Sequence, residues 1–124
     1  MKLLLTVLAL AFSAAAAQAA GVADYYGRWS RGQCDEEWMA LAEGKVTTFN
    51  KQFANIARRP TDVPATIKLD GERLSVDVRE RGRTPRREVY ATDGSDAIIL
   101  QDTFVDGRRM PSITRDQVVF KRCK

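Results

Sequence analysis

Short runs of β-favouring residues follow one another from Tyr25 to the C-terminus, and turn signals interrupt them every eight to ten residues. Regular short strands at this spacing are typical of an all-β sandwich or barrel. The alternation is clearest from Leu74 to Val78, where apolar and polar residues take turns, as in a strand with one buried face. The expected strands are Tyr26–Ser30, Glu37–Ala42, Val46–Asn50, Gln52–Arg58, Ala65–Leu69, Arg73–Glu80, Arg87–Ala91, Ala97–Thr103 and Gln117–Arg122.

Acidic residues followed by glycine mark the expected hairpin tips. The strongest signal is Asp70-Gly71, because a type I′ turn needs positive φ angles, which Asp and Gly tolerate. The segment from Cys34 to Gly44 favours a strand because it is brief, although its acidic start and glycine stop also fit a short helix. The other expected tips are Asp93-Gly94, Asp106-Gly107 and Glu43-Gly44.

The N-terminal segment differs in composition from the rest of the chain. Lys2 precedes an apolar run from Leu3 to Phe12, and the residues from Ser13 to Ala20 are almost all small. This is the layout of a cleavable signal peptide, and the run is shorter than the roughly 20 residues that a membrane-spanning helix needs. We expect a signal peptide of residues 1–19, or alternatively 1–20, and one domain of residues 20–124. The product is expected to be periplasmic or secreted, with no stable membrane insertion.

Cys34 and Cys123 are the only two cysteines, and an even pair in an oxidising compartment predicts a disulfide. The bridge would close a loop of about ninety residues, for which loop-closure entropy gives about 4 to 5 kcal/mol. A zinc site is the alternative, but two thiolates without any histidine would need carboxylates to complete four ligands. If Cys34 ends the first strand of a simple meander and Cys123 ends the last, the strand count must be odd, as it is for the nine expected runs.

Gly27-Arg28-Trp29 stands at the head of the first expected strand. It resembles the G-x-W motif that opens the first strand of the calycin barrels, such as the lipocalins. The resemblance implies that Trp29 packs across a closed barrel end under a late arginine, either Arg122 or Arg115, where a cation–π contact would favour it. Closure would also hide both sheet edges, so the expected fold is a single antiparallel meander forming a closed or nearly closed lipocalin-like β-barrel, or a curved sandwich. The chain is also similar to small exported bacterial domains with an early cysteine and a terminal Arg-Cys.

The composition excludes several functions. Histidine is absent, so Ser-His and Cys-His nucleophilic pairs are impossible. The acidic residues Asp35, Glu36 and Glu37 are adjacent, so strand neighbours among them point to opposite faces and cannot flank one bond. A net charge of +4, or +3 without Lys2, is too small to indicate nucleic acid, and no phosphate or dinucleotide loop is present. We therefore expect no enzyme activity, catalytic residue, metal or cofactor.

Arginines between two expected strands form the most distinctive charged group. Guanidinium forks suit carboxylates and phosphates, so this group would meet an unknown protein or an anionic envelope component; ordinary solvated surface is the alternative. The arginines are Arg79, Arg81, Arg83, Arg86 and Arg87.

Seven aromatic residues lie in expected strands or directly beside one, and we expect them to fill the core of a small barrel, with an apolar ligand pocket as the alternative. They are Trp29, Trp38, Phe49, Phe53, Tyr90, Phe104 and Phe120.

The first functional hypothesis is a non-enzymatic, monomeric binding module of the cell envelope that engages its partner through the arginine loop. An inhibitor of an envelope or secreted hydrolase is the second, although a basic domain is a poor partner for a basic lysozyme. A small apolar-ligand carrier is a further alternative, and a carboxylate hydrolase would require two acids about 5 to 9.5 Å apart in a cleft.

Overall fold

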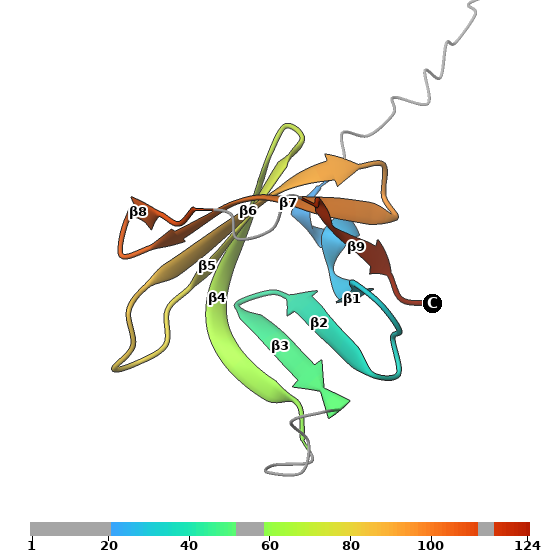
Figure 1. Ribbon diagram of the computed structural model, residues 1–124, viewed down its shortest axis with the longest axis horizontal. Helices are drawn as coiled ribbons and strands as arrows, with labels where there is room; N and C mark the ends of the chain where they lie inside the picture. Colours follow the sequence, from blue (N-terminus) through green and yellow to red (C-terminus); the bar gives the residue numbers. More distant parts are fainter. Residues whose placement is uncertain (1–20, 52–58, 112–115) are drawn as a thin grey trace, which may run out of the picture.

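The computed structural model describes residues 21–51, 59–111 and 116–124, so the expected signal peptide and the expected strand Gln52–Arg58 lie outside the described residues. Within the described part, a short 3-10 helix η1 precedes nine strands that form one antiparallel sheet (Figure 1). No helix there is long and apolar enough to cross a membrane. The elements are η1 (Val22–Tyr25), β1 (Gly27–Ser30), β2 (Glu37–Ala42), β3 (Lys45–Asn50), β4 (Thr61–Asp70), β5 (Arg73–Val78), β6 (Arg86–Asp93), β7 (Ala97–Val105), β8 (Arg108–Arg109) and β9 (Val118–Arg122).

Eight of these strands close into a barrel. The pairing runs from β1 in sequence order to β7, then from β7 to β9, and β9 returns to β1 through Trp29↔Arg122 and Ser30↔Lys121. The two-residue strand β8 pairs with the other end of β7, beside Phe104 and Val105. The expected all-β class and closed antiparallel meander are therefore confirmed, and closure leaves every barrel strand with two neighbours.

The expected strand boundaries hold better at the hairpins than elsewhere. The segment that also fitted a helix is strand β2, and the four acidic-glycine pairs lie at the tips between β2 and β3, β4 and β5, β6 and β7, and β7 and β8. Asp106 and Gly107 have φ angles of 53° and 75°, the left-handed values that a type I′ turn requires. The type I′ turn expected at Asp70-Gly71 is wrong, because Asp70 is still paired with Arg73 in the β4–β5 ladder and only Gly71 of the two has a positive φ angle, 59°. Strand β4 begins at Thr61 rather than at the expected Ala65, and it curves strongly in Figure 1. Its first part, up to Pro64, pairs with β3, and the part from Ala65 onward pairs with β5.

The core lies inside the barrel, and strand alternation decides which residues enter it. In β5, Leu74 and Val76 are buried while Ser75 between them is not, as the sequence pattern indicates. The buried apolar residues are Tyr25, Trp29, Leu41, Val46, Ala65, Leu74, Val76, Tyr90 and Ile98.

The aromatic residues divide between the two faces of the sheet, which corrects the expectation that they all fill the core. Trp38 and Phe49 are cross-strand partners whose rings stack 5.6 Å apart, with the exposed Arg28 placed 4.5 Å over the Trp38 ring. They alternate with the buried Leu41 and Val46, so they lie on the outer face. Phe104 is outside the core cluster as well, and Phe53 lies outside the described residues.

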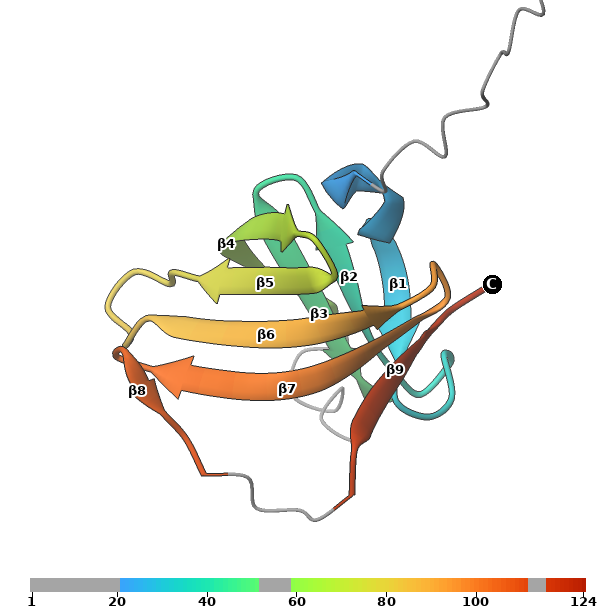
Figure 2. The same cartoon turned by 90° about the horizontal axis from the view of Figure 1, so that it is seen from above.

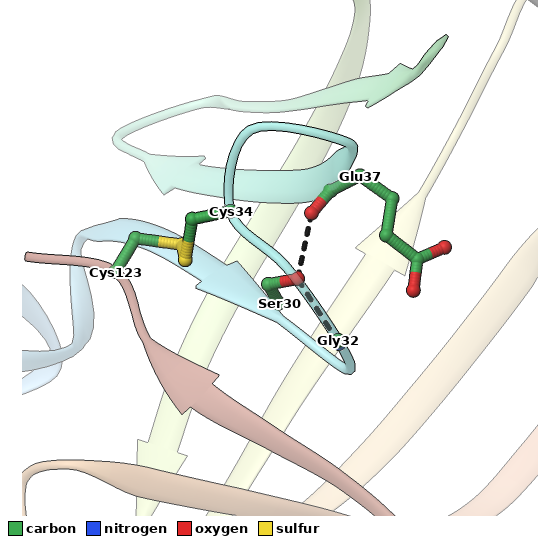
Figure 3. Close-up of a disulfide and its surroundings, with 5 residues drawn as sticks. All are labelled: Ser30, Gly32, Cys34, Glu37 and Cys123. Atoms are coloured by element: carbon green, nitrogen blue, oxygen red, sulfur yellow. Dashed lines mark hydrogen bonds between the residues drawn. A yellow bond between two sulfur atoms is a disulfide. The ribbon is translucent and has the colours of Figure 1, made fainter. Parts of the chain in front are cut away.

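The disulfide Cys34–Cys123 is present, but the odd strand count expected from it is wrong, because the barrel has eight strands. Cys34 does not end β1; it lies in the loop of residues 31–36, which turns back toward the residue that follows β9 (Figure 3). Ser30 holds this loop, since its hydroxyl donates to the Glu37 carbonyl at 2.7 Å and accepts from the Gly32 amide at 3.2 Å. Because this loop folds back, Cys34 can reach Cys123 in a barrel with an even number of strands.

Candidate functional site

One end of the barrel is closed by Trp29 and Arg122, the positions that the G-x-W resemblance singled out. The Arg122 guanidinium lies 4.3 Å from the centroid of the fully buried Trp29 ring. It also donates hydrogen bonds to the carbonyls of Asp24 at 2.6 Å, Tyr26 at 3.0 Å and Ser95 at 2.9 and 3.0 Å. One side chain thus ties η1 and the β6–β7 turn across the end of the barrel. The alternative arginine, Arg115, lies outside the described residues.

Gly27 is the third member of this closed end, and two constraints require glycine there. Its φ angle of +126° disfavours any residue with a side chain, and a Cβ atom would lie 3.3 Å from Nη1 of Arg122. Trp29 is fixed from the same side, because its indole N–H donates to the Tyr25 carbonyl at 2.9 Å and the Tyr25 hydroxyl donates to the Gly94 carbonyl at 3.2 Å. These contacts account for the spacing between the glycine, the tryptophan and the late arginine.

The opposite end of the barrel opens into a cavity of about 560 Å³. The strand ends that border it are the starts of β2, β4 and β6 and the end of β3. In an antiparallel meander these ends lie away from the β6–β7 turn that Arg122 contacts. Trp29 also borders the cavity, although it is fully buried.

The deeper wall of this cavity is apolar. Met39 is in step with the buried Leu41 along β2, and Phe120 stands opposite the buried Ile98, so both side chains face inward. Leu100 and Val118 are cross-strand partners in the same row. Because small barrels of this kind are commonly plugged by side chains, an apolar hollow at one end is a feature that packing alone does not require.

A polar chain lies at the mouth of the cavity. Tyr90 is buried, and its hydroxyl donates to a carboxylate oxygen of Glu88, while the other Glu88 oxygen lies 2.6 Å from Nη2 of Arg86. Burial raises the pKa of the Tyr90 phenol well above its usual value, and the neighbouring charge of Glu88 adds to the shift. Arg31, Arg59 and Glu37 border the mouth as well. The mouth therefore carries three guanidinium groups and two carboxylates.

Three of the five arginines of the predicted anionic-partner loop, Arg79, Arg86 and Arg87, border one hollow, but their side chains have different surroundings. Arg86 lies at the cavity mouth, whereas Arg87, the next residue along β6, lies on the outer face with Asp77, 2.6 Å from its Nε. Arg83 pairs with Glu80 at 3.3 Å. Arg79 and Arg81 are exposed and have no carboxylate partner within the described ranges.

The three adjacent acidic residues Asp35, Glu36 and Glu37 do not share one environment. Asp35 and Glu36 are exposed in the loop after β1, but Glu37 begins β2 and borders the cavity. Glu88, which the sequence analysis did not single out, borders the same cavity. Its signal was the alternation with Tyr90 two residues later, since both side chains project to the interior of β6.

The described residues thus form a closed eight-stranded antiparallel β-barrel that is sealed at one end and has a cavity at the other. No family profile matches the chain, and no curated protein matches it in sequence. Among solved structures, the crystal structure of Treponema pallidum Tp0751 (pallilysin) is similar, with a TM-score of 0.56 and 13% sequence identity over 86% of this chain and 84% of that chain. At that identity the likeness shows a shared fold alone.

Proposed function

We propose that the protein binds a small amphipathic molecule in its open cavity, with the apolar part of the ligand on the barrel floor and an anionic head group at the mouth. The cavity carries this proposal, because its volume of about 560 Å³ lies within the range of about 300–1,000 Å³ found for small-molecule sites. Met39, Leu100 and Phe120 are partly exposed in the cavity and supply apolar surface that a hydrocarbon chain would remove from water.

The charge at the mouth supports an anionic head group. Arg31 and Arg59 are exposed there, and neither has an ion pair among the described residues. Arg86 pairs with Glu88, and this carboxylate is also bonded to Tyr90, so Arg86 keeps donors that a ligand oxygen can use. Guanidinium groups bind carboxylates and phosphates through paired hydrogen bonds.

Binding is a better use of this site than hydrolysis. A carboxylate hydrolase would use Glu37 and Glu88, the two acids that border the cavity. Both oxygens of Glu88 are engaged, one by the Tyr90 hydroxyl and one by Arg86, which favours a fixed carboxylate over one that exchanges protons with a substrate. The proposal is therefore a binding protein without enzyme activity.

The proposed setting is outside the cytoplasm, in the periplasm or as a secreted protein. The disulfide supports it, because such bridges persist in oxidising compartments and are rare in the cytosol. The expected signal peptide of residues 1–19 gives the route of export.

The test is a calorimetric titration of the purified, oxidised protein with decanoate, and in parallel with decanol, which has the same chain and no charge. We expect one site for decanoate with a Kd on the order of micromolar, which corresponds to about 8 kcal/mol, and weaker binding of decanol. Acetate, the head group without the chain, should not bind.

The matched variants are Arg86→Gln at the mouth and Arg73→Gln at the far end of β5, where the side chain is exposed. Loss of a charge-assisted contact should weaken decanoate binding about tenfold in Arg86→Gln and leave decanol binding unchanged. Arg73→Gln should match the wild type for both ligands. Failure of both decanoate and decanol to bind would contradict the proposed function.

A further inference from the structure

A row of side chains crosses the outer face of the barrel at the end where β5, β6, β7 and β8 lie next to one another. Asp77 stands opposite Arg87, Arg87 opposite Phe104, and Phe104 opposite Arg109. Residues directly opposite one another project to the same face. Asp77 is one residue out of step with the buried Val76, so this face is the outer one.

The row borders a second hollow of about 360 Å³, which shares only Arg86 with the described lining of the barrel cavity. Phe104 and Pro85 give it apolar walls, and Arg79 and Arg87 give it charge. The β5–β6 loop and the β7–β8 turn lie side by side here in both views of the barrel (Figures 1 and 2). The Asp106 amide donates to the Pro85 carbonyl at 2.9 Å, so the two connections are joined.

The charges in this hollow are unbalanced. Three arginines and one carboxylate border it, and that carboxylate, Asp77, is occupied by Nε and Nη2 of Arg87 at 2.6 and 3.4 Å. This pairing holds the Arg87 guanidinium in place, and Nη1 of Arg87 takes no part in it. Arg86 pairs with Glu88 at the cavity mouth. Arg79 is exposed and has no carboxylate partner in the part of the chain that the structure describes.

We propose that this outer site, defined by Arg79, Arg87 and Phe104, docks an acidic segment of a partner protein. A carboxylate of the partner lies between the two guanidinium groups, and an adjacent apolar side chain packs on Phe104 and Pro85. Cationic and apolar groups side by side complement a peptide in which acidic and apolar residues alternate, whereas a phosphate polymer would leave the aromatic wall unused. Arg79, Arg87 and Phe104 do not border the cavity, so the proposed docking residues differ from those of the small-ligand site, although Arg86 lies between the two.

The test follows the amide spectrum of the oxidised protein by NMR during titration with a capped peptide of alternating aspartate and leucine. The same peptide with asparagine in place of aspartate is the matched probe, and inorganic phosphate is the third. We expect shifts around Phe104 and Gly107 with a submillimolar Kd for the aspartate peptide only, weakening as salt is raised.

Arg79→Gln should weaken binding of the aspartate peptide at least tenfold. Arg73→Gln, at the exposed start of the strand that ends just before Arg79, should leave it unchanged. Equal binding of the two peptides, binding of phosphate alone, or an unaltered Kd in Arg79→Gln would overturn the proposal. Decanoate affinity is measured in the same variants; Arg79→Gln should leave it unchanged, which separates failure at this site from failure of the proposed function.

Discussion

Replacing Arg122 with leucine tests the closed end of the barrel. Leucine keeps apolar volume over Trp29 but removes the guanidinium and the four hydrogen bonds that it donates to three backbone carbonyls. A cation–π contact on a buried ring contributes about 1 kcal/mol, and charge-assisted bonds contribute about 1.5–3 kcal/mol each when buried. The Arg122 side chain is 25% exposed, so water can replace part of this bonding. We expect a loss of about 3 kcal/mol in the free energy of unfolding, a large share of the roughly 5–15 kcal/mol of a typical domain.

The assay is equilibrium unfolding in urea, followed by tryptophan fluorescence, with Arg73→Leu as the control on an exposed strand end. Arg122→Lys keeps the charge and loses the planar fork, so its stability should fall between that of the wild type and that of Arg122→Leu. If the free energy of unfolding of Arg122→Leu lies within about 0.5 kcal/mol of that of the Arg73→Leu control, Arg122 does not stabilise the barrel and the reasoning is refuted.

A double-mutant cycle with Gly27→Ala separates the two constraints at that glycine. The positive φ angle costs about 1–3 kcal/mol in any background. The close approach of a Cβ atom to Nη1 of Arg122, at 3.3 Å, exists only while the arginine is present. Gly27→Ala should therefore destabilise the Arg122→Leu variant less than the wild type. If the effects of the two substitutions simply add, the close approach of the Cβ atom to Arg122 does not contribute to the requirement for glycine.

Two further predictions concern the bridge and the buried phenol. Replacing both Cys34 and Cys123 with serine opens a loop with a sequence separation of 89, and chain entropy gives a loss of up to about 4.6 kcal/mol in the free energy of unfolding. Unfolding of the double variant in guanidinium chloride measures this loss. A loss under about 1 kcal/mol would argue against a structural role for the bridge. Tyr90 has a raised pKa in the folded state, so the unfolded chain loses this proton first as the pH rises. Stability should therefore fall above about pH 10, by up to about 1.4 kcal/mol per pH unit from this group, and Tyr90→Phe should remove that part of the slope. An unchanged alkaline slope in Tyr90→Phe would contradict this.

Local signals in the sequence predicted the fold well because each works within a few residues. Asp-Gly pairs specify turns through backbone conformation alone, and the alternation around Leu74 and Val76 places one face inside. The disulfide was predicted from the two cysteines and the expected oxidising compartment, but the placement of Cys34 at the end of the first strand was wrong. Cys34 reaches Cys123 through a loop that turns back, held by Ser30, and the conformation of a loop depends on contacts that sequence spacing does not contain.

The candidate sites were harder to predict because they depend on which face of a strand a residue occupies. Arg86 and Arg87 are adjacent in the chain and read as one charged loop, but β6 begins at Arg86 and sends the two side chains to opposite faces. Trp38 and Phe49 were likewise predicted to be core residues, but their rings stack on each other across two strands on the outer face. Face assignment requires the strand boundary to be known to within one residue, and boundaries are the least certain part of a sequence prediction.

Trp29 connects the two ends of the barrel. Its ring lies under Arg122, and the fully buried residue also borders the cavity, so the residue that seals one end lies just beneath the proposed binding site. A ligand that binds only the folded barrel stabilises it by about 2.7 kcal/mol at a hundred times its Kd. This gain is similar in size to the contribution that we assign to the arginine cap. Occupancy of the cavity would therefore compensate for a weakened cap, because the cap and the ligand both stabilise the same folded state.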